Sequence, residues 1–394
     1  MPLEVSRGTV VEGEAWSVDP SSLPEGYDVI VWGRLPDAAA GPREALLAAA
    51  SREVTLSTIH RRAPAPLRVA AVHRLPARQL DHGPRGRLRS FVRGGAMVEF
   101  SSPSSGRRIL DEVMAAAGGR PASSQLYAGS GGALLRSLAV GADQRAFLRV
   151  ARAGGSGDPS HLSTTLRQVA AARIPLAPRL LGQGETAGAS WILETALSGR
   201  RPRRLTLDLA RQAADLVSSF PRTGGRPTTL ERDLRGIAFA LPRFADPLER
   251  LNAELRPMLQ EVPAVMRHGD LWTGNLLVSR GRLCGVIDWD ASDPAAVPGS
   301  DLLQLVAGEI RRRARASLGT AFLMQPWRTD LFTKVAAPYW SEIELEPTPQ
   351  LLDLVGIAWW ATEAHGTLAR LPHRAADRGW VESNVEAVLS ALAP

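Results

Sequence analysis

Cysteine, lysine and long apolar runs are all scarce in this sequence of 394 residues. The only cysteine, Cys284, excludes an intramolecular disulfide and leaves no cysteine cluster for a structural zinc ion. No apolar run is long enough to cross a bilayer, and the opening stretch MPLEVSRGTVVEGEAW has neither the basic nor the apolar segment of a signal peptide. These absences predict a globular chain that is cytoplasmic.

Lysine is the scarcest of the charged residues. Lys334 is the single lysine among 47 basic residues, so the formal net charge of +7 rests on arginine. Positive charge of this size permits contact with nucleic acid or an anionic surface. The arginines are scattered, however, and the densest runs, 200–204 and 311–315, lack the interleaved aromatic residues of a groove for single strands. We therefore expect neither nucleic acid nor a membrane as a partner.

Several catalytic motifs are also missing. The sequence has no G-x-S-x-G elbow, which argues against an α/β-hydrolase. It has no G-x-x-x-x-G-K-[ST] loop and no H-E-x-x-H pair, which argues against a P-loop enzyme and a zinc protease of that type.

The pattern of apolar residues divides the chain into three sections. Residues 1–118 mix strand-like runs such as YDVIVWGRL and LRVAAVHRL with helical ones at 43–51 and 107–118, which predicts a small α/β N-terminal domain. Residues 119–199 predict five strands with one helix after the third. Residues 200–394 are mainly helical, with a β-hairpin whose turn lies at Ser279–Gly281.

The stretch RHGDLWTGN carries the clearest chemical signal. It places Asp270 and Asn275 in a loop before a strand with four residues between them, the spacing of H-R-D-x-x-x-x-N in protein kinases. In such phosphotransferases the aspartate accepts the proton of the acceptor hydroxyl, and the asparagine helps to hold magnesium. Asp288 ends the next apolar run, GVIDWD, where a kinase has its second metal ligand. The predicted catalytic residue is Asp270, and the predicted metal ligands are Asn275 and Asp288.

On the motifs HGDLWTGN, VIDWD and PGSDLL the sequence resembles aminoglycoside phosphotransferases and related small-molecule kinases, including fructosamine and choline kinases. The resemblance begins near residue 123 and runs to the C-terminus. It implies an α+β, protein-kinase-like fold with two lobes, a five-stranded antiparallel small lobe at 119–199 and a mainly helical catalytic large lobe at 200–394. It also implies Mg²⁺-dependent transfer of a phosphoryl group from ATP or GTP to a hydroxyl of a small molecule, such as a sugar, an antibiotic or an amino alcohol.

The resemblance assigns roles to further residues. Asp301 would be a structural partner of the catalytic loop, and His268 would brace that loop without reacting. Arg149 stands where kinases have the lysine that holds the α- and β-phosphates. The main-chain groups of Glu194–Ala196 would meet the purine edge at a hinge between the lobes.

Three features of the sequence leave alternatives open. The turn AGSGG could bring Ser130 and Gly131 to the phosphates through main-chain N–H groups, or it could be a plain hairpin connection. The helix at 161–174 carries no acidic partner for Arg149. The alternative to an enzyme is therefore a pseudokinase, a binding or regulatory protein with degenerate nucleotide handling.

The late helical run LLDLVGIAWWATEAHGTLARL has an open assignment too. Trp359, Trp360, Glu363 and His365 form either a core stripe or a substrate contact, and the core stripe is the preferred interpretation. The accessory domain at 1–118 would pack on the lobes, contribute to substrate selection or form a homodimer interface.

Overall fold

Contacts between residues divide the chain into two units. In the computed structural model, unit 1 comprises Met1–Thr164 with Arg179–Ala196, and unit 2 comprises Thr165–Pro178 with Leu197–Pro394. The structure describes residues 3–5, 9–11, 29–34, 68–75, 95–101, 109–118, 120–128, 134–140, 144–152, 159–186 and 189–393. The predicted phosphate contacts Ser130 and Gly131 and the helical run predicted at 43–51 lie outside these residues.

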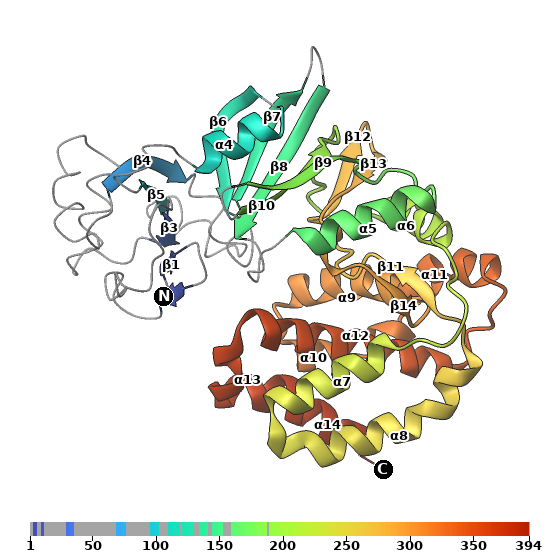
Figure 1. Ribbon diagram of the computed structural model, residues 1–394. Helices are drawn as coiled ribbons and strands as arrows, with labels where there is room; N and C mark the ends of the chain where they lie inside the picture. Colours follow the sequence, from blue (N-terminus) through green and yellow to red (C-terminus); the bar gives the residue numbers. More distant parts are fainter. Residues whose placement is uncertain are drawn as a thin grey trace. The chain divides into compact units, whose positions relative to one another are not determined.

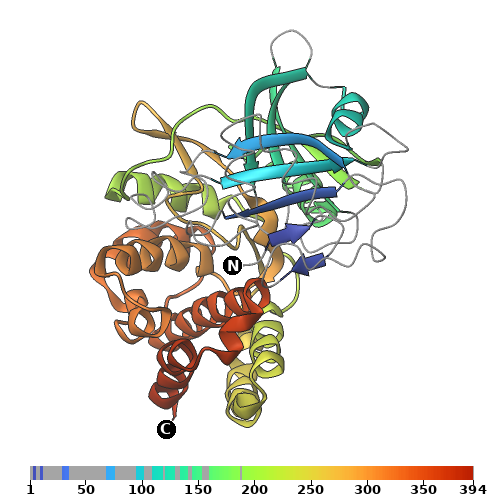
Figure 2. The same cartoon turned by 90° about the vertical axis from the view of Figure 1, so that its left-hand side faces the viewer.

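Unit 1 contains two antiparallel sheets. The strands of the first sheet are, in spatial order, β2 (Thr9–Val11), β1 (Leu3–Val5), β3 (Val29–Arg34), β5 (Gly95–Ser101) and β4 (Arg68–Leu75). Figure 2 shows them side by side in blue and cyan, and each described pairing is antiparallel. The strand-like runs of the first predicted section are therefore strands, as their β-branched and aromatic residues favour.

The second sheet contains the residues of the predicted small lobe. Its strands are, in spatial order, β6 (Arg120–Ala128), β7 (Leu134–Val140), β8 (Gln144–Arg152), β10 (Ala189–Thr195) and β9 (Leu180–Thr186). Helix α5 (Ser160–Ala171) follows the third strand, β8, so the predicted topology is confirmed. Helix α4 (Ile109–Ala116) contacts β8, β9 and β10. The central strands are buried along both faces, at Leu148–Val150 of β8 and at Trp191–Leu193 of β10.

Unit 2 is mainly helical (Figure 1). Its main helices are α6 (Leu207–Ser218), α7 (Thr229–Ala240), α8 (Ala245–Glu261), α9 (Ser300–Ala314), α10 (Leu318–Leu323), α11 (Asp330–Glu342), α12 (Pro349–Arg370), α13 (Arg378–Val381) and α14 (Ala387–Leu392). Strand β11 (Val265–Arg267) pairs with β14 (Asp293–Ala296), and β12 (Leu276–Ser279) pairs with β13 (Arg282–Val286). The second pair is the predicted hairpin, and its turn residues Arg280 and Gly281 have φ angles of 49° and 79°. A five-stranded sheet followed by this helical unit is the α+β organisation that the resemblance implied.

Large aromatic side chains fill the core of unit 2. Trp360, Trp289, Tyr339 and Phe332 are each at most 2% exposed, and Trp359 is 3% exposed. The core interpretation of the Trp359–Trp360 pair is confirmed. Within the part of the chain that the structure describes, no helix is long and apolar enough to cross a membrane.

Candidate active site

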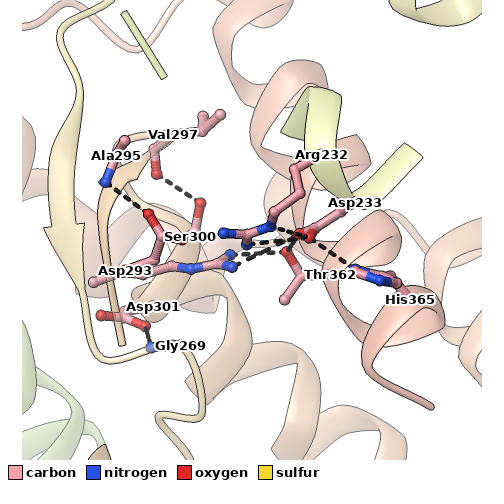
Figure 3. A network of polar contacts seen from close by, with 11 residues as sticks. Arg232, Asp233, Gly269, Asp293, Ala295, Val297, Ser300, Asp301, Thr362 and His365 are labelled. Carbon is pink, nitrogen blue, oxygen red and sulfur yellow. Dashed lines mark hydrogen bonds and ion pairs between the residues drawn. The ribbon is translucent and has the colours of Figure 1, made fainter. Parts of the chain in front are cut away.

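The loop that follows β11 is shaped by one glycine and one carboxylate. Gly269 has a φ of 82°, and a Cβ added there would collide with the main-chain oxygen of Ala291. Only glycine fits this close approach in the left-handed region. The Asp301 carboxylate, at the start of α9, accepts a hydrogen bond from the main-chain N–H of His268 at 2.6 Å. It also accepts the main-chain N–H of Gly269 at 2.9 Å (Figure 3). Asp301 is thus the structural partner of this loop, as predicted.

His268 links the loop to the segment that carries Asp288. Its Nδ1 accepts the main-chain N–H of Asp270 at 3.2 Å, so Nε2 carries the proton and donates to the Ile287 carbonyl at 3.1 Å. Burial lowers the pKa of His268, which keeps the ring neutral, and the ring meets Trp289 edge-on with centroids 4.6 Å apart. The predicted bracing role of His268 is confirmed.

Asp270 and Asn275 are in direct contact. The Asn275 amide nitrogen donates to the Asp270 carboxylate and to its main-chain oxygen, both at 2.9 Å. Burial raises the pKa of Asp270 to about 7, and the negative charges of Glu363 and Asp288 add to this, while Asn275 and Arg370 oppose it. Near neutral pH this carboxyl group is therefore poised between its two protonation states, which suits a group that accepts a proton.

Asp288 lies at the end of the run that continues β13, in a left-handed conformation with φ of 72° and ψ of 59°. The main-chain N–H of Ile287 donates to the Asn275 carbonyl at 3.0 Å and holds this segment beside the loop. Aspartate tolerates the left-handed region better than most residues, yet the conformation still costs about 1 kcal/mol. The structure therefore brings Asp270, Asn275 and Asp288 together within unit 2.

Glu363 on α12 completes the charged surroundings of Asp270. Its carboxylate accepts hydrogen bonds from Gln304 at 3.0 Å and from Arg311 at 3.2 Å, and it is close enough to raise the pKa of Asp270. The sequence pattern favours a core role for this stretch of α12. Trp359 and Trp360 have that role, whereas the Glu363 side chain remains 18% exposed and acts on the candidate site.

The residues predicted to contact the nucleotide belong to unit 1. Arg149 lies on the central strand β8 and is 9% exposed. Glu194 is near the end of β10, and the main-chain N–H of Ala196 donates to the Arg145 carbonyl at 3.0 Å. The roles of Arg149, Glu194 and Ala196 stay predictions.

The comparison with protein families decides the affiliation. The APH profile, described as the phosphotransferase enzyme family, matches residues 128–328. The chain belongs to this phosphotransferase enzyme family. The matched part of this APH-family chain contains Asp270, Asn275 and Asp288 of unit 2. It also contains the predicted nucleotide contacts of unit 1. The predicted resemblance is therefore confirmed.

Solved structures of several phosphotransferases are similar to this APH-family chain. One is an aminoglycoside-3′-phosphotransferase of type VIII, with 21% identity, a TM-score of 0.45 and coverage of 65% of this chain and 98% of that one. Another is the macrolide 2′-phosphotransferase MphH from Brachybacterium faecium, with 15% identity, a TM-score of 0.44 and coverage of 70% and 98%. A third is APH(3″)-Id from Streptomyces rimosus in complex with ADP and streptomycin, with 15% identity, a TM-score of 0.40 and coverage of 65% and 96%. No match was found among curated proteins.

Proposed function

We propose that the protein is a small-molecule kinase, which transfers the γ-phosphoryl group of ATP or GTP to a hydroxyl group in a reaction that depends on Mg²⁺. The observation that carries the proposal is the 2.9 Å contact between Asn275 and the Asp270 carboxylate, in a loop fixed by Asp301. A phosphotransferase works mainly by positioning its reactants and neutralising charge. It therefore needs a rigid loop that holds two polar side chains in a fixed arrangement. A sugar, an antibiotic and an amino alcohol are all suitable acceptors.

In this proposal Asp270 orients the acceptor hydroxyl and takes its proton. The loop holds Asp270 at two points, because Asn275 donates to its carboxylate and His268 accepts its main-chain N–H. Burial and neighbouring carboxylates raise the pKa of Asp270 to about 7, which makes it a stronger base than an exposed aspartate. Correct placement of a general base contributes about 10²- to 10⁴-fold to the rate.

Asn275 and Asp288 would hold the magnesium ion. The amide nitrogen of Asn275 is used by Asp270, so its oxygen Oδ1 is the atom that can bind a cation. Magnesium prefers oxygen ligands and is commonly held by one or two protein groups together with phosphates and water. When bound, the ion would neutralise charge on the β- and γ-phosphate oxygens.

The test uses the full chain with Mg²⁺ and either ATP or GTP. We expect a rise in melting temperature on addition of nucleotide that requires Mg²⁺, and ADP or GDP release when a panel of hydroxylated compounds is added. Phosphoryl transfer should disappear in Asp270→Ala while nucleotide binding remains. Nucleotide binding without transfer to any acceptor would instead favour the pseudokinase alternative, and the absence of both would reject nucleotide chemistry at this site.

A further inference from the structure

Arg267 is a buried cation directly before the catalytic loop. It is the last residue of β11, is 5% exposed, and immediately precedes His268. Its main-chain oxygen accepts a hydrogen bond from the Ser292 hydroxyl at 2.7 Å, in the segment after Asp288. Its side chain leaves the loop for helix α12, where Nη1 donates to the Thr362 hydroxyl at 2.8 Å. A single residue therefore connects the loop, the Asp288 segment and α12.

Asp233 on α7 provides the negative charge that Arg267 requires. It is 2% exposed, and its Oδ2 lies 3.7 Å from Arg267 Nη2 and accepts the Thr362 hydroxyl at 2.7 Å. Its Oδ1 is 3.0 Å from His365 Nδ1, and Arg232 closes the network from the outer side (Figure 3). Burial acts to raise the pKa of this carboxyl, but the hydrogen bond with His365, the charges of Arg267 and Arg232 and the Thr362 hydroxyl hold it below its usual value. Asp233 is thus a buried anion with partners from three elements.

The rotation of α12 about its own axis is fixed by this network. Thr362 and His365 are three residues apart, so they share one face of the helix and both bond Asp233. Gly236 on α7 permits this approach, because a Cβ there would overlap the His365 ring. Glu363 follows Thr362 directly, accepts hydrogen bonds from Gln304 and Arg311, and lies near enough for its charge to act on the Asp270 carboxyl group. Any rotation that broke the Thr362 bonds would therefore also move Glu363.

Stability alone does not account for this arrangement. A buried ion pair is often no more stabilising than apolar residues of the same volume, because both charges lose their hydration. The geometry is also incomplete as a stabilising contact, since the buried Arg267 Nε has no hydrogen-bond partner. The network instead restricts the loop to one orientation relative to α12.

We propose that Arg267 is a positioning residue, which ties the Asp270 loop to α12 through Thr362 and Asp233 and so fixes Glu363 relative to the acceptor side of Asp270. The inference rests on the proposed function. It adds a residue outside the recognised motifs that sets the geometry of the site. Because misplacement by about 1 Å can cost up to 10²-fold in rate, loss of one hydroxyl in the network should lower kcat measurably. Nucleotide binding should not change, because none of these side chains is a predicted nucleotide contact.

The test compares Thr362→Val, which removes the hydroxyl and keeps the shape, with Thr362→Ser, which keeps the hydroxyl. Thr367→Val on the same helix is the matched control, since its hydroxyl takes no part in the network. The assay uses MgATP, with water and a panel of hydroxylated compounds as acceptors, and hydrogen exchange of the peptide 265–275 is measured in parallel. We expect Thr362→Val to lower kcat about tenfold with the KM for nucleotide within about twofold, and to speed exchange in that peptide. Thr362→Ser and Thr367→Val should resemble the parent protein.

The outcomes separate the two proposals. Unchanged kcat and unchanged exchange in Thr362→Val would overturn the positioning role, even if the parent protein is an active kinase. If the parent protein shows no transfer, the proposed function fails, and exchange of the 265–275 peptide still decides whether the network holds the loop. Should Thr362→Val fail to fold, Arg267→Lys replaces it, because lysine keeps the charge but cannot bond Thr362 and Asp233 with two separate nitrogens of a fork. Parent-like kcat and exchange in that variant would equally reject the proposal.

Discussion

The second sheet of unit 1 and the catalytic loop of unit 2 place their candidate functional residues in different physical settings. In the sheet, most of the buried positions are apolar, as at Leu148, Val150 and Leu193, and Arg149 is the buried cation among them. In the loop, several of the buried groups are polar, and His268 and Asn275, with Asp301 of α9, take part in specific hydrogen bonds. Apolar packing tolerates changes of similar volume, whereas a buried hydrogen-bond network tolerates almost none. Function in unit 2 should therefore be far more sensitive to single atoms.

The largest effect is expected at Asp270. Asp270→Asn keeps the shape and can still bond Asn275, but it cannot accept the acceptor proton. We expect phosphoryl transfer to fall about 10³-fold, equivalent to about 4 kcal/mol, with the Kd for nucleotide little changed. Transfer rates and nucleotide titrations would measure this. Asp215→Asn, on the exposed face of α6, is the control and should retain full activity, and an active Asp270→Asn protein would remove Asp270 from the mechanism.

A large loss of stability is expected at Gly269. Gly269→Ala would force a side chain into a residue with φ of 82° and against the Ala291 carbonyl. We expect the free energy of unfolding to fall by about 3 kcal/mol, as measured by chemical denaturation. Gly281→Ala is the matched control, because its φ is 79° but nothing lies near the added Cβ. That variant should lose only about 1 kcal/mol. Equal losses at the two glycines would show that backbone strain, and not the contact with Ala291, fixes the loop.

The sequence predicted those parts of the molecule that depend on local patterns. The spacing of Asp270 and Asn275 and the β-hairpin are examples, because turn residues and short motifs act over a few positions. Strands β11 and β14 were not predicted, because three or four residues are too few to show a period.

The polar network could not be predicted from the sequence. Asp233 and Thr362 are 129 positions apart, and the contact between them depends on how α7 packs on α12. The role of Glu363 could not be predicted either. The residues of α12 are apolar around most of its circumference, so the sequence shows no separate polar face. Arg267 stands directly before the recognised motif, yet nothing local to it indicates a partner on a distant helix.

A third prediction concerns stability and pH. The pKa of Asp270 is raised to about 7 in the folded protein, from an ordinary value of 3.8 for an aspartate. Asp270 therefore binds its proton more tightly in the folded than in the unfolded protein. Its ionisation lowers the free energy of unfolding, fully above pH 7 and progressively less as the pH falls toward 4. We therefore expect Asp270→Asn to be more stable than the parent protein by about 2 kcal/mol at pH 8 and to lose this advantage by pH 4.

Chemical denaturation of both proteins across this pH range checks the prediction. Asp215→Asn, at an exposed position on α6, is the control variant measured in the same series. An advantage for Asp270→Asn that does not depend on pH would mean that the carboxyl group is not strained by burial and by its neighbours, and that the stabilisation has another origin.

The smallest effect is expected in unit 1, at Arg149. If this arginine replaces the usual kinase lysine, Arg149→Lys should still hold a phosphate, but through one nitrogen in place of a bidentate fork. We expect the KM for nucleotide to rise by less than tenfold, equivalent to less than about 1.4 kcal/mol, with little change in kcat. Arg145→Lys, an exposed position on the same strand, serves as the control. A fall in stability with an unchanged KM would instead make Arg149 a structural cation of the sheet, and a buried charge would then help to hold this mainly apolar sheet together as well as the polar catalytic loop.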